Sequence, residues 1–449
     1  MRGARVAVLC AAFAVALTLA APAAAKPKLL TFKAGPFPVS AYAVRLGNDM
    51  GSIPTPRRDG WITRMEADVV DTRTGKVVPI KRIMLHHIVF WNLGTRFDRR
   101  QPFYGDGEER AKMILPPGYG YRVRAGDRWG FVWMLMNHRP RADSVYIRYR
   151  VWFDTARKKE VIPMVWDTSH GRQGLVFDVP GTGGPGAQDT RISQYRAVVA
   201  GRLVAGLGHV HGGATDLSLG RPECPSTGRH IYRSRPTWGL PSNAFYKVRP
   251  VLHEPGPINM SQFTSRSGIP IAKGELVRVT SRYDDTRPHT RAMGLMLAYL
   301  HPDPSVTSPC GARPADYRLL RTSTPGRARA PKVRVNIYDY GADGRVRKVP
   351  GPPSAFQRLV GDASASAFDF AFRAGNISVP QGATVRWRFD GPSLHNVTVA
   401  GGPEGFSSNR LSRGRLFEKR LTRPGTYTLF CELHPVGMIQ RIVVRPPGG

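Results

Sequence analysis

Short apolar–polar alternations, interrupted by glycine and proline, constrain this chain more than any other feature of its sequence. The chain contains 48 glycines and 39 prolines and few long stretches with helical periodicity. In SVYIRYRVWF (144–153), Val145, Ile147, Tyr149 and Val151 fall on one face of an extended strand. Segments 195–211 and 274–285 are further strand candidates. These patterns predict an all-β protein.

The first 25 residues have the order of a secretory signal. Arg2 and Arg5 precede an apolar run over 6–20, and small residues follow up to Ala25. The apolar run is too short to be a membrane anchor. We expect cleavage after about Ala25 and a secreted or extracytoplasmic mature chain.

The rest of the chain is too long for one compact core, so several domains are expected. A Gly/Pro-rich break at 180–189 divides the first part into two β-sandwiches, 26–184 and 185–317. A connector rich in proline and arginine follows at 318–365, with one strand expected at 333–338. The last predicted domain covers 366–449.

The charge is strongly positive, with 66 Lys and Arg against 32 Asp and Glu, or +34 formally. The positive residues are spread along the chain without a basic arm or an interleaved aromatic repeat. This distribution, together with export, argues against a nucleic-acid partner. An anionic cell-envelope surface is the more suitable partner for such a charge.

The segment RPGTYTLFCELHPVGMIQRIVV (423–444) carries Cys431, His434 and Met438, and His395 lies on an earlier predicted strand. Two imidazoles, one thiolate and a weak thioether form the ligand set of an electron-transfer copper site. The order of these four residues therefore predicts type 1 copper. The alternative is a plain β-sandwich in which Cys431 is buried without a metal.

The cysteine count agrees with this interpretation. Without the signal, the chain has Cys224, Cys310 and Cys431. In an oxidising compartment a pair of cysteines forms a disulfide, and a leftover thiol needs another role. With Cys431 assigned to copper, we expect a Cys224–Cys310 disulfide.

The C-terminal domain resembles the plastocyanin-like cupredoxins through VPQGATVRW, HNVTV, FSSNRLSRG, RPGTYTLFCELHP and the closing IVV. The resemblance implies a Greek-key β-sandwich that exchanges electrons with an external one-electron donor or acceptor. Asn376 and Asn396 each begin a glycosylation sequon. Because Asn396 adjoins His395, we interpret it as part of the site.

Five upstream histidines form three clusters: the adjacent pair His86 and His87, the single His138, and His209 with His211. Side chains two apart on a strand share a face, so His209 and His211 can bind one ion. Adjacent His86 and His87 can share a metal if the strand is twisted or bulged, or if they use different ring nitrogens. For each histidine alone, a satisfied core residue is the alternative.

At these clusters the chain resembles the copper type II, ascorbate-dependent monooxygenases that hydroxylate peptidylglycine and dopamine. The resemblance implies two jelly-roll-like β-sandwiches with one copper each. It implies a first copper at His86, His87 and His138, with His170 as the alternative third ligand. It implies a second copper at His209, His211 and Met293, with Met296 as the alternative to Met293.

Two residues depart from the peptide-hydroxylating pattern, because Leu207 replaces an arginine and Leu297 a tyrosine. Peptide amidation is therefore disfavoured, and a more apolar substrate is compatible. The overall prediction is an exported multicopper protein that hydroxylates a small organic C–H substrate with dioxygen; no catalytic residue besides the metal ligands is assigned. The alternatives are a non-catalytic secreted copper-binding or electron-transfer protein and an envelope-binding scaffold.

Overall fold

The computed structural model describes residues 26–96, 101–171, 175–320, 325–333, 335–349 and 355–448. The predicted signal, residues 1–25, lies outside the described residues. The predicted all-β class is confirmed, because nearly every regular element is a strand. In the described ranges the helical elements are α1 (Ser226–Arg229) and the 3-10 turn η2 (Ala244–Lys247). None of the helices described there is long and apolar enough to span a bilayer.

The first half is a sandwich of two sheets that enclose an apolar core. One sheet contains β1 (Lys28–Val39), β9 (Asp143–Asp154), β3 (Gly60–Asp71), β7 (Tyr119–Val123) and, on β3, β6 (Met113–Ile114). The other contains β2 (Val44–Ile53), β8 (Trp129–Asn137), β4 (Ile83–Asn92) and β5 (Gln101–Gly107). The alternation predicted in β9 is confirmed, since Val145, Ile147, Tyr149 and Val151 are all fully buried.

The second half repeats this arrangement and shares a sheet with the first. Its long sheet contains β10 (Lys159–Asp167), β21 (Gly294–Pro302), β13 (Gly201–Val210), β18 (Gln262–Ile271) and β22 (Arg318–Leu320). The facing sheet contains β12 (Gln188–Arg196), β19 (Leu276–Asp284), β14 (Ala214–Gly220) and β15 (His230–Ser234). Two small pairs complete it: β11 (Phe177–Val179) with β20 (His289–Ala292), and β16 (Pro236–Thr237) with β17 (Asn259–Met260). Parallel pairing of β7 with β10 joins the halves.

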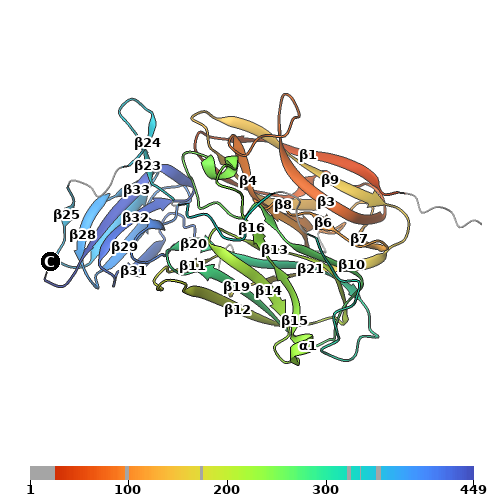
Figure 1. Cartoon of the computed structure of the whole chain (residues 1–449). Coiled ribbons are helices and arrows are strands. Elements are labelled where there is room, and N and C mark those ends of the chain that lie inside the picture. Colours follow the sequence, from red (N-terminus) through yellow and green to blue (C-terminus); the bar gives the residue numbers. More distant parts are fainter. Residues whose placement is uncertain are drawn as a thin grey trace, which may run out of the picture.

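The C-terminal domain is a third sandwich, drawn in blue at the left of Figure 1. Its larger sheet contains β24 (Val346–Lys348), β23 (Tyr338–Tyr340), β33 (His434–Arg445), β28 (Asn376–Pro380), β25 (Gln357–Arg358), β32 (Gly425–Cys431) and β30 (Thr398–Gly401). Its smaller sheet contains β27 (Ala371–Arg373), β26 (Ala363–Phe368), β29 (Thr384–Phe389) and β31 (Leu416–Arg420). The connector also contributes strands: β22 pairs with β18, and β23 pairs with β33. The strand expected at 333–338 instead begins at Tyr338.

The C-terminal sandwich packs directly on the first two halves. Val44 and Met134, from the first half, belong to the same buried apolar cluster as Cys431 and Leu433. The backbone N–H of Val44 donates to the carbonyl of Leu433 (3.4 Å). In Figure 1, β20 lies at the boundary with the blue domain, and Thr290 Oγ1 of that strand donates to the Val399 carbonyl of β30 (3.1 Å). The end of the C-terminal domain that contains Cys431 and Leu433 therefore contacts the rest of the chain.

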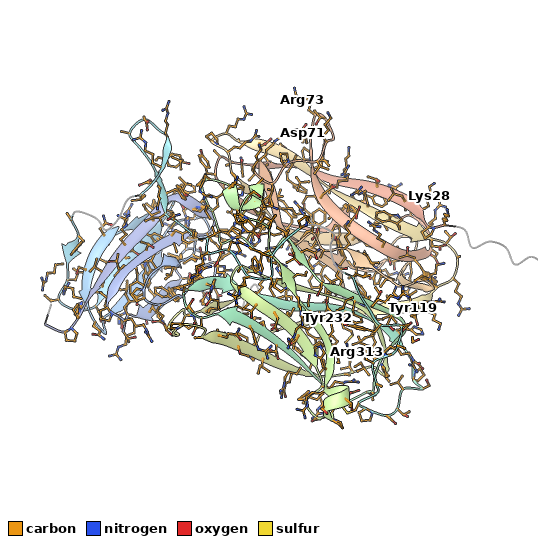
Figure 2. All side chains as sticks on the ribbon, in the orientation of Figure 1. Lys28, Asp71, Arg73, Tyr119, Tyr232 and Arg313 are labelled. Carbon is orange, nitrogen blue, oxygen red and sulfur yellow. A yellow bond between two sulfur atoms is a disulfide. The ribbon has the colours of Figure 1, made fainter. Side chains whose placement is uncertain are left out.

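Side chains fill the spaces between the sheets (Figure 2). Tyr232, labelled in the second half, is fully buried, whereas Lys28 and Arg73 lie at the outer margin of the first half. The burial of apolar area on folding is the main stabilising contribution in such sandwiches.

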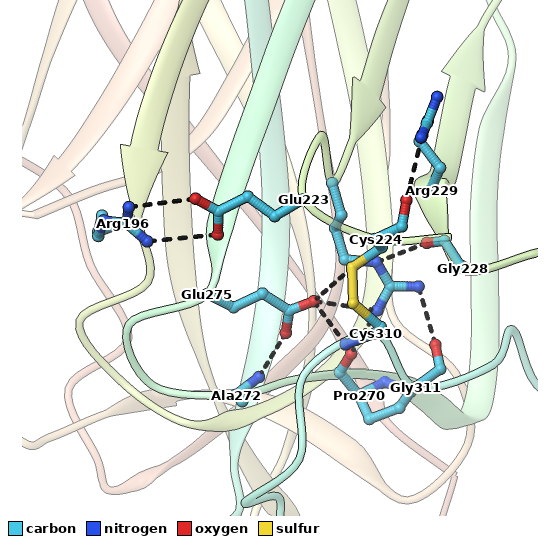
Figure 3. Close-up of a disulfide and its surroundings, with 11 residues drawn as sticks. Arg196, Glu223, Cys224, Gly228, Arg229, Pro270, Ala272, Glu275, Cys310 and Gly311 are labelled. Atoms are coloured by element: carbon cyan, nitrogen blue, oxygen red, sulfur yellow. Dashed lines mark hydrogen bonds and ion pairs between the residues drawn. A yellow bond between two sulfur atoms is a disulfide. The ribbon is translucent and has the colours of Figure 1, made fainter. Parts of the chain in front are cut away.

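The predicted disulfide between Cys224 and Cys310 is present and closes a loop over a sequence separation of 86 residues. A buried carboxylate supports it: Glu275 accepts from the backbone N–H of Cys310 (2.9 Å) and of Ala272 (2.8 Å), as Figure 3 shows. Arg221 pairs with Glu275 and donates to the Gly311 carbonyl (2.8 Å). The side chains of Arg221 and Glu275 are almost completely buried.

The substitution Arg221→Leu should destabilise the chain strongly, because the Glu275 carboxylate then stays buried without a cation beside it. Removal of one member of a buried pair costs about 3–5 kcal/mol. The matched control is Arg196→Leu, which removes an exposed pair with Glu223 drawn in Figure 3. That change should cost less than about 1 kcal/mol. Urea unfolding measures both free energies, and equal losses would contradict the assignment.

Candidate metal centres

The C-terminal centre is built from two adjacent strand ends and one more distant segment. Cys431 ends β32 and His434 begins β33, so that they face each other across a two-residue turn. His395 is held beside them by an isolated bridge to Leu411. The Nδ1 atoms of His395 and His434 are 3.2 Å apart, and the Cys431 Sγ lies 3.9 Å and 3.7 Å from them, respectively. Three donor atoms therefore converge on one point.

Met438 belongs to β33 itself. The pairing of β32 with β33 shifts register between Phe430 and Cys431, which creates a bulge after His434. Gly437 has φ +90° in this bulge, a conformation that favours glycine. Met438 follows, fully buried in the same apolar cluster as Cys431.

The neighbours of these ligands restrict which atoms can bind a metal. Asp369 Oδ1 lies 3.2 Å from His395 Nε2, which leaves Nδ1 of His395 facing Cys431. The Asn396 backbone N–H donates to the Cys431 sulfur (3.5 Å), and its side-chain oxygen accepts from the Glu432 N–H (2.8 Å). Asn396, expected to be part of the site because it adjoins His395, lies against the Cys431 thiol. Asp369 was not anticipated.

Burial sets the protonation of the centre. It raises the pKa of the Cys431 thiol to about 11 and, together with the nearby His395, lowers the pKa of His434 to about 4. In the metal-free chain at neutral pH, Cys431 is thus a thiol and His434 a neutral imidazole. A metal that binds here displaces the thiol proton. Two imidazoles, a thiol and a buried thioether fit copper.

Four of the five upstream histidines, all except His138, gather in one place. The pairing of β4 with β8 shifts register between Leu85 and His87, which is the bulge that a shared orientation of His86 and His87 requires. Their Nδ1 atoms are 3.1 Å apart. The rings of His86 and His211 are separated by 5.2 Å between centroids. The two predicted copper sites therefore lie next to each other.

His209 and His211 present two unused nitrogens. The Nδ1 of His209 lies 2.9 Å from Glu109 Oε1, and the Nδ1 of His211 lies 2.7 Å from the Arg291 carbonyl. The Nε2 atom of each ring is buried without a hydrogen-bond partner. A buried nitrogen of this kind is costly unless something binds it, and tying Nδ1 orients Nε2 for metal ligation.

Of the two candidate methionines, Met293 lies at the histidines. It lines one cavity with His209 and another with His211. Met296 is fully buried in the apolar core of the second half.

The candidates for the third ligand of the first copper lie apart from the His86–His87 pair. His138 is buried and lines a small cavity with Met84 and His253. Burial and the neighbouring His253 lower the pKa of His138 to about 3. His170 is exposed and has a positive φ. His138 therefore shares a cavity with His253, whose ring lies 4.8 Å from that of His86 between centroids. Sequence reasoning missed His253.

The described residues contain three groups whose three ligand atoms lie within 4.8 Å of one another. One is His395, Cys431 and His434, and another contains the disulfide cysteines. The third is His86, Glu108 and His253, of which only His86 was anticipated. Glu108 and Glu109 form the only Glu–Glu pair in the sequence, which was the available signal for this group.

An apolar cavity of about 580 Å³ opens beside the histidines. His87, His209 and Met293 lie in its wall, as do Leu207 and Leu297. The two leucines that depart from the peptide-hydroxylating pattern therefore line the same space as the metal-ligand candidates.

Acid should destabilise the metal-free chain before its carboxylates titrate. Burial holds His87 and His138 at pKa values of about 3, so the unfolded state binds more protons below pH 6.5. Each such histidine should therefore lower the free energy of unfolding by about 1.4 kcal/mol for every pH unit below about 6.5. His138→Leu should flatten this slope in urea titrations between pH 7 and 4. The exposed control His170→Leu should not, and equal slopes for both variants would refute the assignment.

Comparison with known proteins adds partial matches to solved structures. No family model matches the chain. A reduced amicyanin mutant matches 19% of this chain and 83% of its own at 23% identity, with a TM-score of 0.18. A purple cupredoxin from Nitrosopumilus maritimus matches 19% of this chain and 100% of its own at 24% identity, with a TM-score of 0.18.

Proposed function

We propose that the chain is an exported copper oxidoreductase. In this proposal the C-terminal domain carries electrons, and the upstream sandwiches oxidise a C–H substrate with dioxygen. The observation that carries it is the convergence of the His395, His434 and Cys431 donor atoms within 3.9 Å of each other. Met438 is buried in the same apolar cluster as Cys431. Copper held by these four residues supplies a one-electron carrier.

A chain of contacts connects this centre with the upstream histidines. Glu432 follows Cys431 directly, and its Oε2 lies 2.5 Å from Arg291 Nε. The carbonyl of Arg291 lies 2.7 Å from Nδ1 of His211. The path from Cys431 to His211 therefore runs through Glu432 and Arg291, and it crosses one ion pair and one hydrogen bond. This proximity supports a joint function of the two centres.

The apolar cavity supports an apolar substrate. His209, His211 and Met293 are the residues that would hold a copper at its edge, where dioxygen chemistry requires a reactive metal. Leu207 and Leu297 line the cavity in place of the polar groups that a peptide carboxylate requires. An uncharged hydrocarbon portion is the kind of group that such a lining binds.

A second candidate function is a non-catalytic carrier that stores copper or electrons outside the membrane. The loss of the polar substrate residues at Leu207 and Leu297 favours it. The two functions differ in oxygen consumption. An oxygenase consumes dioxygen with a reductant and an apolar substrate, whereas a carrier only changes its redox state.

Copper stoichiometry with electron paramagnetic resonance tests the proposal on the copper-loaded chain. We expect one signal with the small hyperfine splitting of a thiolate site, and at least one ordinary tetragonal signal. Cys431→Ser should remove the first signal and the blue absorbance, because it deletes the thiolate, while the second signal persists. His301→Ala, which changes a histidine outside both clusters, is the control. A single blue copper and no tetragonal signal would reduce the protein to a carrier.

Glu432→Gln should slow the reoxidation of the reduced blue centre by dioxygen, because it weakens the ion pairs of this carboxylate with Arg291 and Arg410. Stopped-flow absorbance of the copper-loaded chain measures this rate. Glu404→Gln is the matched control, since it removes another carboxylate–cation pair of the same domain, with Lys419. Identical slowing in both variants would exclude a specific role for Glu432.

A further inference from the structure

The two ring nitrogens of His86 face different partners. Nδ1 lies 3.1 Å from Nδ1 of His87, while Nε2 lies 3.4 Å from Glu108 Oε1. The same Glu108 oxygen also contacts His253 Nε2, and the rings of His86 and His253 are 4.8 Å apart between centroids. Three ligand atoms from β4, the segment after β5 and the loop before β17 thus meet at one point.

We propose that His86 Nε2, Glu108 Oε1 and His253 Nε2 form a metal site for a divalent transition-metal cation such as Zn²⁺. Two imidazoles and one carboxylate are a ligand set that binds zinc and iron in proteins, and it contains no soft sulfur that would select copper. Three protein ligands leave a coordination position open. His86 and His253 also line one cavity, together with His211.

The charge balance of Glu108 supports a bound cation. Its side chain is almost completely buried, and both of its ion-pair partners among the described residues are imidazoles. A buried carboxylate without adequate charge compensation costs several kcal/mol. A divalent cation between the three atoms offsets that charge.

The hydrogen bonds around the group are compatible with ligation. Glu108 Oε2 accepts from the backbone N–H of Gly256 (2.6 Å), which fixes the carboxylate and leaves Oε1 for the metal. When His86 binds through Nε2, its proton is on Nδ1, where it can be donated to Nδ1 of His87. His86 and His87 then do not share a metal. The predicted first copper site at His86, His87 and His138 requires the opposite use of His86.

This site shares no residue with the C-terminal centre or with His209, His211 and Met293. Its failure in an experiment is therefore separable from failure of the proposed function, which depends on the blue copper signal and on oxygen consumption.

Zinc binding to the full mature chain tests the proposal. In a Cys431→Ser background, which removes the thiolate, the metal-stripped chain is titrated with Zn²⁺ and the bound metal is counted after gel filtration. Adding Glu108→Gln should abolish one equivalent of zinc. Adding Glu66→Gln, which changes a buried carboxylate that pairs with Arg64 and Arg150 away from the histidines, should leave that equivalent bound. Loss in both variants, or in neither, overturns the proposal.

Zinc-soaked crystals of the unaltered chain give a second result that does not depend on the folding of a variant. We expect an anomalous peak at zinc–ligand distances of about 2.0–2.2 Å from His86 Nε2, Glu108 Oε1 and His253 Nε2. A peak between His86 Nδ1 and His87 Nδ1, or no peak near Glu108, overturns the assignment.

Discussion

The carboxylate of Glu432 connects the C-terminal sandwich with the second half of the chain. Its two oxygens lie 2.5 Å from Arg291 Nε and 2.6 Å from Arg410 Nε. Arg291 also donates to the Ser408 carbonyl, and its own carbonyl orients His211. A charge-assisted network in a partly buried interface contributes more than an exposed pair. The position of the cysteine loop, the docking of the C-terminal sandwich and the tautomer of His211 are thereby linked.

The features that sequence reasoning could predict are those in which chemistry dictates spacing. The order of His395, Cys431, His434 and Met438 matches the ligand set of an electron-transfer copper site, and the donor atoms of the two histidines and the cysteine lie together. The odd cysteine count left Cys224 to pair with Cys310. The two-residue period of a β-strand predicted that His209 and His211 lie on one face, and their ring centroids are 5.1 Å apart. The same periodicity identified the buried face of β9.

The features that escaped prediction arise from contacts between segments far apart in sequence. Glu108 and His253 are separated by 145 residues, and neither belongs to a repeating pattern. The bulge at His86 depends on how β4 pairs with β8, which alternation within β4 does not reveal. The strand pairing of the connector also escaped prediction, because the partners of β22 and β23 lie in two different sandwiches.

The burial of Asn396 has a consequence for producing the protein. Its side-chain nitrogen donates to Thr398 Oγ1 (2.8 Å), so the asparagine and threonine of its sequon bind each other in the core. A glycan attached to that nitrogen has no room in the folded domain. A host that glycosylates chains during translocation would therefore compete with folding at this asparagine. Recombinant material from such a host would contain a fraction that cannot close its C-terminal sandwich, whereas a host without this modification avoids the competition.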